Sequence, residues 1–334
     1  MESTDHLAEH ITIDQIIQKI WTNCSGLGKE GNKSTKNILT DEEIMYVLAL
    51  IRQEEDQTPT IRELVLEDPN IIEIDGPVTV VGDIFAKIGD LLRIFEYGGL
   101  PPSTTYLFLG NYVDHGYRGI EVICLLYAYK IKYPKAIYLL RGNHEFKSVN
   151  RICGFFYECK KRYCVRVWKA FAKSFQYLSA AAIINDSIFC THGGIIPELL
   201  QKDGLETLSS IPRVVDGTDN PLLLNMCFSS PSPKISSFSP NEISYGTHFG
   251  MKALTTFLNV HSFSAIVRSH SLQEDGFKAH FGGLCTTVFS AANFREAHSN
   301  FGAILQISEF NEIEHKQFSS CVKYSRKNKV KFGF

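Results

Sequence analysis

The spacing of apolar positions changes along the chain. Near the N-terminus, apolar side chains recur three and four positions apart in three segments, at residues 11–24, 41–54 and 59–66. This spacing predicts helices with one buried face, and Thr40 followed by acidic residues is a typical start signal for the second of them. From residue 77 on, short runs of β-branched and aromatic residues alternate with helical stretches such as Gly89–Glu96 and Ile120–Lys132. The alternation predicts an α/β fold in which strands are layered against helices.

Two segments interrupt this alternation. The Ser/Pro-rich stretch 229–240 is predicted to be a loop rather than a domain linker, because strand-like runs resume after it. Residues 316–334 are basic and weakly apolar, and we expect them to form a flexible tail.

Composition and charge narrow the class of protein. The chain has 334 residues, 44% of them apolar, and a formal net charge of −2. This near-neutral balance argues against general binding to nucleic acid or to acidic membranes, and no apolar run approaches the ~18 residues of a membrane span. The polar, acidic N-terminus argues against a cleaved signal peptide. The nine cysteines are irregularly spaced, which indicates reduced thiols and a cytoplasmic or nuclear protein.

Five of the predicted strands are followed directly by turns, most of them with glycine, that carry Asp, Asn or His. The residues are Asp83, Asn111, Asp114, His115, Asn143, His144, His192 and His270. In layered α/β proteins, sites form beyond the carboxyl ends of strands, and these side-chain types are ligands for Mn, Fe or Zn. Taken singly, each is most often ordinary turn chemistry or a hydrogen-bonded histidine. The order and spacing of the whole set favour a metal site.

These turns and their neighbours resemble the successive motifs of the phosphoprotein phosphatases. The motifs are Gly82-Asp83-Ile84, Gly110-Asn111-Tyr112-Val113-Asp114, Arg141-Gly142-Asn143-His144-Glu145, His192-Gly193-Gly194 and Ser290-Ala291-Ala292-Asn293. Two longer strings, Leu91–Gly99 and Ala128–Pro134, resemble the type-1 branch in particular. The resemblance extends over residues 11–310, and the family that it indicates is that of the metallo-dependent serine/threonine phosphatases.

The resemblance implies a β-sandwich flanked by helices, a four-layer α+β arrangement with two metals that activate a water for attack on phosphorus. It implies one domain, residues 1–315, with a helical part at 11–70 and a metal-site core at 76–310. His144 matches the general acid that protonates the leaving oxygen, and Asp114 matches the carboxylate that orients it. The metal ligands that it implies are Asp83, Asn111, Asn143, His192 and His270.

Several positions depart from the family pattern. Phe85 stands in place of a metal-binding histidine, and Asn111 in place of the aspartate that bridges both metals. His115 replaces one of two phosphate-binding arginines, and the other position falls near Ile243. We therefore expect at most one Mn, Fe or Zn ion at good occupancy. Even with a protonated His115 restoring some positive charge, the rate should fall at least about four orders of magnitude below that of the family.

Two functional interpretations remain open. The first is a catalytically impaired or inactive pseudophosphatase that binds phosphoproteins or phosphatase regulatory subunits. The second is an active metal-dependent serine/threonine phosphatase with a reduced metal site, supported by the retained His144 and Asp114. The tail residues Lys329-Val330-Lys331-Phe332 are also similar to the short basic peptide by which regulators dock on type-1 phosphatase, although a solvated basic tail is the simpler interpretation.

Overall fold

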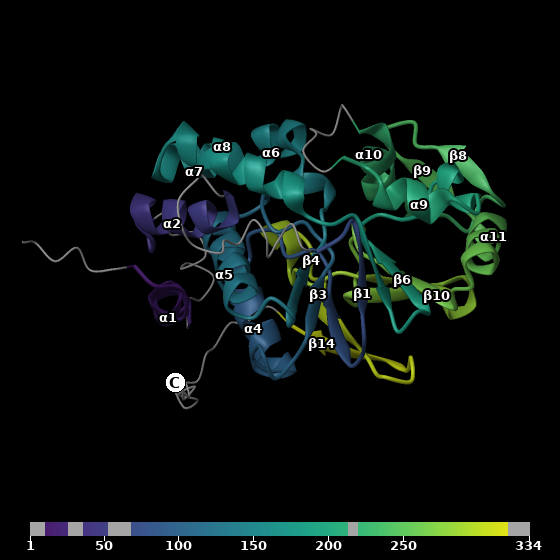
Figure 1. Ribbon diagram of the computed structural model, residues 1–334, viewed down its shortest axis with the longest axis horizontal. Helices are drawn as coiled ribbons and strands as arrows, with labels where there is room; N and C mark the ends of the chain where they lie inside the picture. Colours follow the sequence, from purple (N-terminus) through teal and green to yellow (C-terminus); the bar gives the residue numbers. More distant parts are fainter. Residues whose placement is uncertain (1–10, 26–35, 53–67, 213–219, 320–334) are drawn as a thin grey trace, which may run out of the picture.

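Two β-sheets stack face to face in the centre of the molecule (Figure 1). The computed structural model describes residues 11–25, 36–52, 68–212 and 220–319. One sheet has the order β14-β13-β2-β3-β4, made by β2 (Val78–Val81), β3 (Tyr106–Phe108), β4 (Ile137–Leu139), β13 (Gly302–Ile307) and β14 (Ile313–Phe318). The other has the order β1-β5-β6-β10-β12-β11, made by β1 (Ile71–Ile74), β5 (Ala181–Ile184), β6 (Ile188–Thr191), β10 (Ala265–Arg268), β11 (Phe277–His280) and β12 (Cys285–Val288).

The inner strands of the five-stranded sheet are covered on both faces. Val80 and Leu107 pack against the other sheet, whereas Val81 and Phe108 pack against helices. Successive residues of a strand point to opposite faces. A strand that is buried on both faces is therefore mostly apolar, as β2 and β3 are, with Thr79 the one polar residue of β2.

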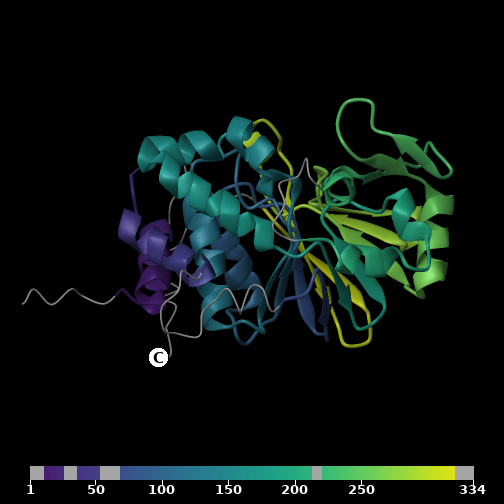
Figure 2. The ribbon, with the colours of Figure 1, turned by 45° about the horizontal axis from the view of Figure 1, so that its top comes forward.

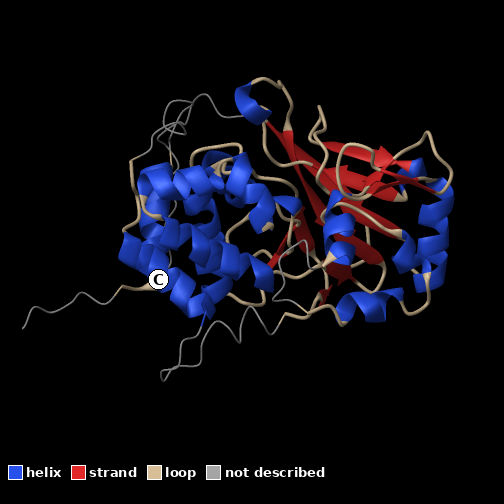
Figure 3. Ribbon diagram, turned by 90° about the horizontal axis from the view of Figure 1, so that it is seen from above, coloured by secondary structure: helices blue, strands red, loops and turns tan. Residues whose placement is uncertain are grey.

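Helices cover the outer face of each sheet (Figures 2 and 3). The five-stranded sheet carries α1 (Ile13–Cys24), α2 (Asp41–Arg52), α4 (Ile88–Gly98), α5 (Gly119–Lys132), α7 (Phe155–Arg162) and α8 (Val165–Ser174). The six-stranded sheet carries α9 (Gly204–Ser209), α10 (Pro221–Phe228) and α11 (Met251–His261). This arrangement confirms the predicted α/β sandwich flanked by helices. Within the described ranges, none of the helices has the length and hydropathy that crossing a membrane requires.

The helix start predicted at Thr40 forms a reciprocal cap. The Glu43 N–H donates to Thr40 Oγ1 at 3.1 Å, and the Thr40 N–H donates to the Glu43 carboxylate at 2.7 Å. Each bond satisfies a backbone donor that the first turn of a helix leaves without a partner. The predicted helical stretch 59–66 lies outside the described residues.

Part of the stretch predicted to be a loop forms a third, small sheet. Its strands are β7 (Ser230–Pro231), β8 (Phe238–Pro240) and β9 (Thr247–Phe249), in the order β7-β9-β8. The loop prediction for residues 229–240 is therefore wrong at both ends of the stretch. Strands of two and three residues are too short to show an alternating pattern, and prolines hide them further.

Strand β14 extends past the predicted start of the basic tail. It reaches Phe318, so the first three residues assigned to the tail lie in a strand. β14 is at the edge of its sheet, and of its six residues Phe318 alone is buried. An edge strand that is almost wholly exposed can be polar, which is why its sequence resembles that of a tail. The remaining residues assigned to the tail, from 320 on, lie outside the described residues.

Candidate functional site

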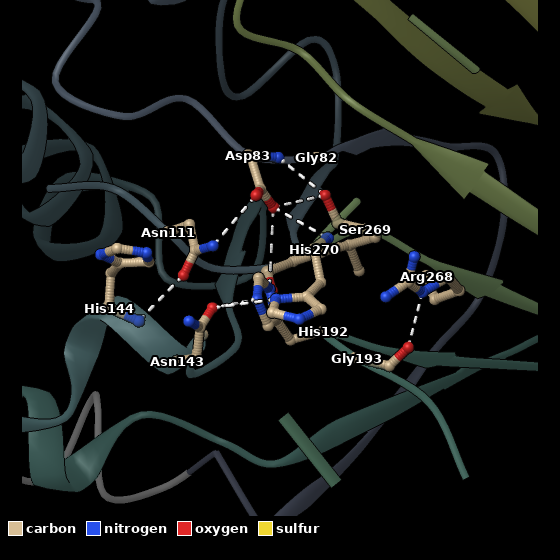
Figure 4. A network of polar contacts seen from close by, with 12 residues as sticks. Gly82, Asp83, Asn111, Asn143, His144, His192, Gly193, Arg268, Ser269 and His270 are labelled. Atoms are coloured by element: carbon tan, nitrogen blue, oxygen red, sulfur yellow. Dashed lines mark hydrogen bonds and ion pairs between the residues drawn. The ribbon is translucent and has the colours of Figure 1, made fainter. Parts of the chain in front are cut away.

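The turns that carry the candidate residues meet at one edge of the sandwich. Strands β2, β3 and β4 are parallel, as are β6, β10 and β12, so the carboxyl ends within each group lie together. A parallel bridge between Asp83 and Phe289 links the two sheets there. Figure 4 shows that this edge gathers all five predicted ligands into one polar network: Asp83, Asn111, Asn143, His192 and His270.

The buried carboxylate of Asp83 is the centre of the network. Its Oδ1 accepts hydrogen bonds from Ser269 Oγ at 2.5 Å and from the His270 N–H at 3.1 Å. Its Oδ2 accepts one from Asn111 Nδ2 at 3.0 Å. Both oxygens are therefore satisfied by the protein itself. Sequence reasoning missed Ser269, although it directly precedes His270.

A backbone contact fixes the orientation of the Asn111 amide. The His144 N–H donates to Asn111 Oδ1 at 3.0 Å, so the amide nitrogen faces Asp83. That nitrogen is a donor without a lone pair for a metal. The Glu145 carboxylate holds the turn in place by accepting from the N–H groups of Asn111 and Tyr112, both at 2.8 Å. As oriented, Asn111 bridges neighbouring residues by hydrogen bonds and offers no ligand atom to a bridging ion.

Ring nitrogens of His192 and His270 converge on the side-chain oxygen of Asn143. His192 Nδ1 lies 2.8 Å from the Leu109 carbonyl oxygen, which can only accept, so Nδ1 carries the proton. Burial lowers the pKa of both histidines well below the usual value, and the rings are neutral at pH 7.

His192 Nε2 therefore presents a lone pair, and it lies 2.9 Å from Asn143 Oδ1. His270 Nδ1 lies 3.1 Å from the same oxygen. Two acceptors in contact repel each other unless a cation or a proton lies between them. Imidazole nitrogens and an amide oxygen are a donor set that can hold one Zn, Mn or Fe ion.

Phe85 closes the opposite side of the network with a hydrophobic cluster. Its ring is 5% exposed and lies 4.8 Å from Phe294, 5.0 Å from His115 and 6.0 Å from Phe289, measured between centroids. Its edge-to-face contact with His144 has a centroid distance of 5.0 Å. A phenyl ring offers no ligand atom, so this side of the site is packed rather than coordinating.

His144 and Asp114 form the predicted dyad. His144 Nδ1 lies 2.7 Å from Asp114 Oδ2. The other Asp114 oxygen, Oδ1, accepts from the Phe155 N–H at 2.7 Å, which fixes the carboxylate at the start of α7. A histidine held in this way keeps one tautomer and can exchange a proton through its other nitrogen.

A cysteine thiol lies beside the dyad. Cys153 ends α6 (Lys147–Cys153), and its Sγ lies within 4.8 Å of ligand atoms of Asp114 and His144. Burial and the nearby Asp114 raise the thiol pKa, so it stays protonated at pH 7. His144 and Asp114 are hydrogen-bonded to each other and the thiol keeps its proton, so these three groups do not present a set of free ligand atoms. We therefore do not place a metal there.

His115 is neutral at pH 7. Burial, followed by the neighbouring His144 and the positive charge of Arg295, lowers its pKa to about 3. The expectation that a protonated His115 replaces part of the lost charge is therefore wrong. The positive charge comes instead from Arg295, whose Nη2 lies 3.0 Å from His115 Nε2. Sequence reasoning missed this arginine because it is 180 residues away along the chain.

Two further side chains, those of Ile243 and Arg268, are not placed to bind an anion at the network. Ile243 is 96% exposed in the loop between β8 and β9, where it carries no charge. Arg268 is buried, and it donates to the carbonyl oxygens of Gly193 at 2.5 Å and Ser229 at 3.2 Å and to Ser271 Oγ at 2.8 Å. Neither residue offers a guanidinium to an incoming anion.

A layered sandwich with its polar site at the carboxyl ends of parallel strands is the architecture of the metallophosphatases. The calcineurin-like phosphoesterase family model matches residues 76–274. The chain belongs to this family. Family membership implies the use of a divalent metal.

Solved structures agree with this assignment. A protein serine/threonine phosphatase from Saccharomyces cerevisiae, described as similar to human phosphatase PP5, is 27% identical with a TM-score of 0.74. The match covers 85% of this chain and 91% of that one. A cold-active protein-tyrosine phosphatase of a psychrophilic Shewanella species shares the fold, with 16% identity, a TM-score of 0.53, and coverage of 78% of this chain and 86% of that one.

Proposed function

We propose that this protein is a catalytically impaired phosphatase that binds phosphoproteins or phosphatase regulatory subunits. The observation that carries the proposal is the hydrogen bond from Asn111 Nδ2 to Asp83 Oδ2, at 3.0 Å. It places a neutral donor where a bridging carboxylate would collect two dications, and both Asp83 oxygens already accept hydrogen bonds from protein donors. Phe85 removes a further ligand from the same side.

The residues that would hold a single Mn, Fe or Zn ion are Asn143, His192 and His270. When bound, such an ion polarises a phosphoryl oxygen or a water molecule. His144, held by Asp114 at 2.7 Å, would supply a proton to a leaving oxygen through its other nitrogen. This arrangement lacks ligands for a second ion, and it lacks a pair of arginines to bind the phosphoryl oxygens.

The alternative is a working serine/threonine phosphatase with a mononuclear site, and the well-formed His144–Asp114 dyad favours it. Turnover of a phosphoserine peptide in Mn²⁺ separates the two functions. We expect a rate at least about four orders of magnitude below that of an active family member, unchanged by His144→Ala. Clear turnover that His144→Ala abolishes would establish the alternative.

Docking of the tail on a type-1 phosphatase remains a separate proposal. Lys329-Val330-Lys331-Phe332 lie outside the described residues. If the proposal is correct, deletion of residues 328–334 abolishes co-purification of a type-1 catalytic subunit. Unchanged co-purification after the deletion would contradict the docking proposal. We also propose a cytoplasmic or nuclear location, supported by eight free cysteines among the described residues.

A further inference from the structure

A pinned loop carries Arg295 over the site. Lys87 Nζ donates to the carbonyl oxygens of Ala292 at 2.5 Å and Asn293 at 2.9 Å. On the far side of the loop, Asn300 Oδ1 accepts from the Phe294 N–H at 2.8 Å. The loop is therefore held on both sides of its tip.

The tip has a backbone conformation that is uncommon for residues other than glycine. Asn293 has a φ of 50° and Arg295 a φ of 54°, both in the left-handed region. Such a conformation persists only where the surrounding contacts enforce it. The loop anchors supply that enforcement, and they give the Arg295 side chain a defined direction.

The Arg295 guanidinium lies against two rings. Nη2 is 3.0 and 3.2 Å from the two ring nitrogens of His115, and Cζ is 5.2 Å from the centroid of Phe294. The residue is exposed, and within the described residues all of its hydrogen bonds come from Nη2. The Nε and Nη1 side of the planar group is left for a ligand. A neutral His115 can accept this contact without charge repulsion.

Two other arginines near the site, Arg141 and Arg268, are buried in the protein interior. Arg268 uses Nε and Nη2 on backbone carbonyls, and Arg141 is buried with its Cζ 4.2 Å above the ring of Phe146. Arg295 is the exposed guanidinium among these three. A guanidinium with a free forked edge pairs with two oxygens of a phosphate at once.

We propose that Arg295, braced by His115 and Phe294, binds the phosphoryl group of a phosphomonoester in a phosphorylated protein. The contact supplies from a different loop the positive charge that position 115 lacks. It requires no metal ion. The inference rests on the proposed binding of phosphoproteins, and it assigns Arg295 as the residue that distinguishes a phosphorylated ligand from an unphosphorylated one.

The test is calorimetric titration of the full chain with O-phosphoserine and with inorganic phosphate, each in the presence of a chelator. Arg295→Gln should raise both Kd values about 10- to 100-fold, the loss of affinity expected when a hydrogen bond to a charged group is removed. Arg166→Gln, on the exposed face of α8, removes the same charge and should leave both Kd values unchanged. Thermal melting verifies that both variants are folded.

The outcomes separate the inference from the function. If the wild type binds phosphoserine but not serine, and Arg295→Gln binds it equally well, Arg295 is not the anion contact and the proposed function survives. If the wild type does not discriminate phosphoserine from serine, phosphate recognition at this site is wrong and the inference fails with it. Affinity that rises as the phosphate loses its second proton near pH 6, and rises less in Arg295→Gln, supports the contact with a dianion.

Discussion

The two sides of the site have opposite character. On one side, ring nitrogens of His192 and His270 lie 2.9 and 3.1 Å from the side-chain oxygen of Asn143, an arrangement that suits a cation or a proton. On the other side, Phe85 packs into an aromatic cluster, and its phenyl ring binds neither a metal cation nor a proton. At a position where the family resemblance implies a coordinating imidazole, a phenyl ring of similar shape packs into the core because it has no ligand atom for a metal.

Asp83 lies between the two sides and shows how the change is completed. A buried carboxylate needs hydrogen-bond donors, and Ser269, Asn111 and the backbone of His270 provide them. This part of the site is held together by hydrogen bonds among the protein's own groups. Its restoration should therefore need changes at Phe85 and Asn111 together.

The largest effect is expected from reversing both exchanges. Phe85→His with Asn111→Asp restores two metal ligands, and we expect turnover of a phosphopeptide in Mn²⁺ to rise about 10³-fold or more, the scale of recovering charge-stabilising groups. Either single change should give less than a tenth of this gain. Equal turnover in the double variant and the wild type would mean that these two positions do not limit catalysis.

The packed side should matter more for stability. Phe85→Ala removes a buried ring from four aromatic contacts, and we expect the free energy of unfolding to fall by about 4 kcal/mol in urea titrations. A matched change on the surface, Tyr97→Ala, should cost less than about 0.5 kcal/mol. A loss below about 1 kcal/mol for Phe85→Ala would show that its cluster is loosely packed.

Asp90 supports the same side by accepting the Ala292 N–H at 3.1 Å. Burial raises its pKa from 3.8 to about 6. The folded state therefore binds this proton more tightly than the unfolded chain, and the stability that this group contributes is lost as the pH rises from 4 through 6. Asp90→Asn should match the wild type near pH 4 and exceed it by up to about 3 kcal/mol at pH 7.5. The same stability difference at both pH values would contradict this.

The smallest effect concerns Ser269, which joins the two sides through Asp83. Its hydroxyl donates to Asp83 Oδ1 and accepts from the Asp83 N–H at 2.8 Å. Ser269→Ala should lower the free energy of unfolding by about 1–2 kcal/mol, because a buried N–H loses its acceptor. Ser187→Ala, at an exposed hydroxyl pair, is the control and should change it by less than about 0.5 kcal/mol.

The sequence predicts those elements whose residue pattern is set by burial in the core. The runs at β2 and β3 are mostly apolar because both faces are covered, and the turns after them meet because the strands are parallel. The edge strand β14 escapes prediction because almost nothing in it is buried. Burial patterns thus locate the core and the site together.

The sequence does not predict contacts that depend on orientation or on distant residues. The identity of Asn111 is plain in the chain, but its role as a donor depends on the backbone N–H of His144, which fixes its amide. That position 115 is a histidine and not an arginine is equally plain. The position of Arg295 beside it, however, depends on the contacts by which Lys87 and Asn300 hold the loop. Motif reading shows which residues are missing and cannot show what replaces them in space.

The number of metal ions per chain tests the central claim most directly. The purified protein, equilibrated with Mn²⁺ or Zn²⁺ and then dialysed, should contain at most one ion by plasma mass spectrometry, and His192→Ala should remove it while the exposed His315→Ala does not. Two tightly held ions per wild-type chain would contradict the account, because the positions of Phe85 and Asn111 would then have to accommodate a metal.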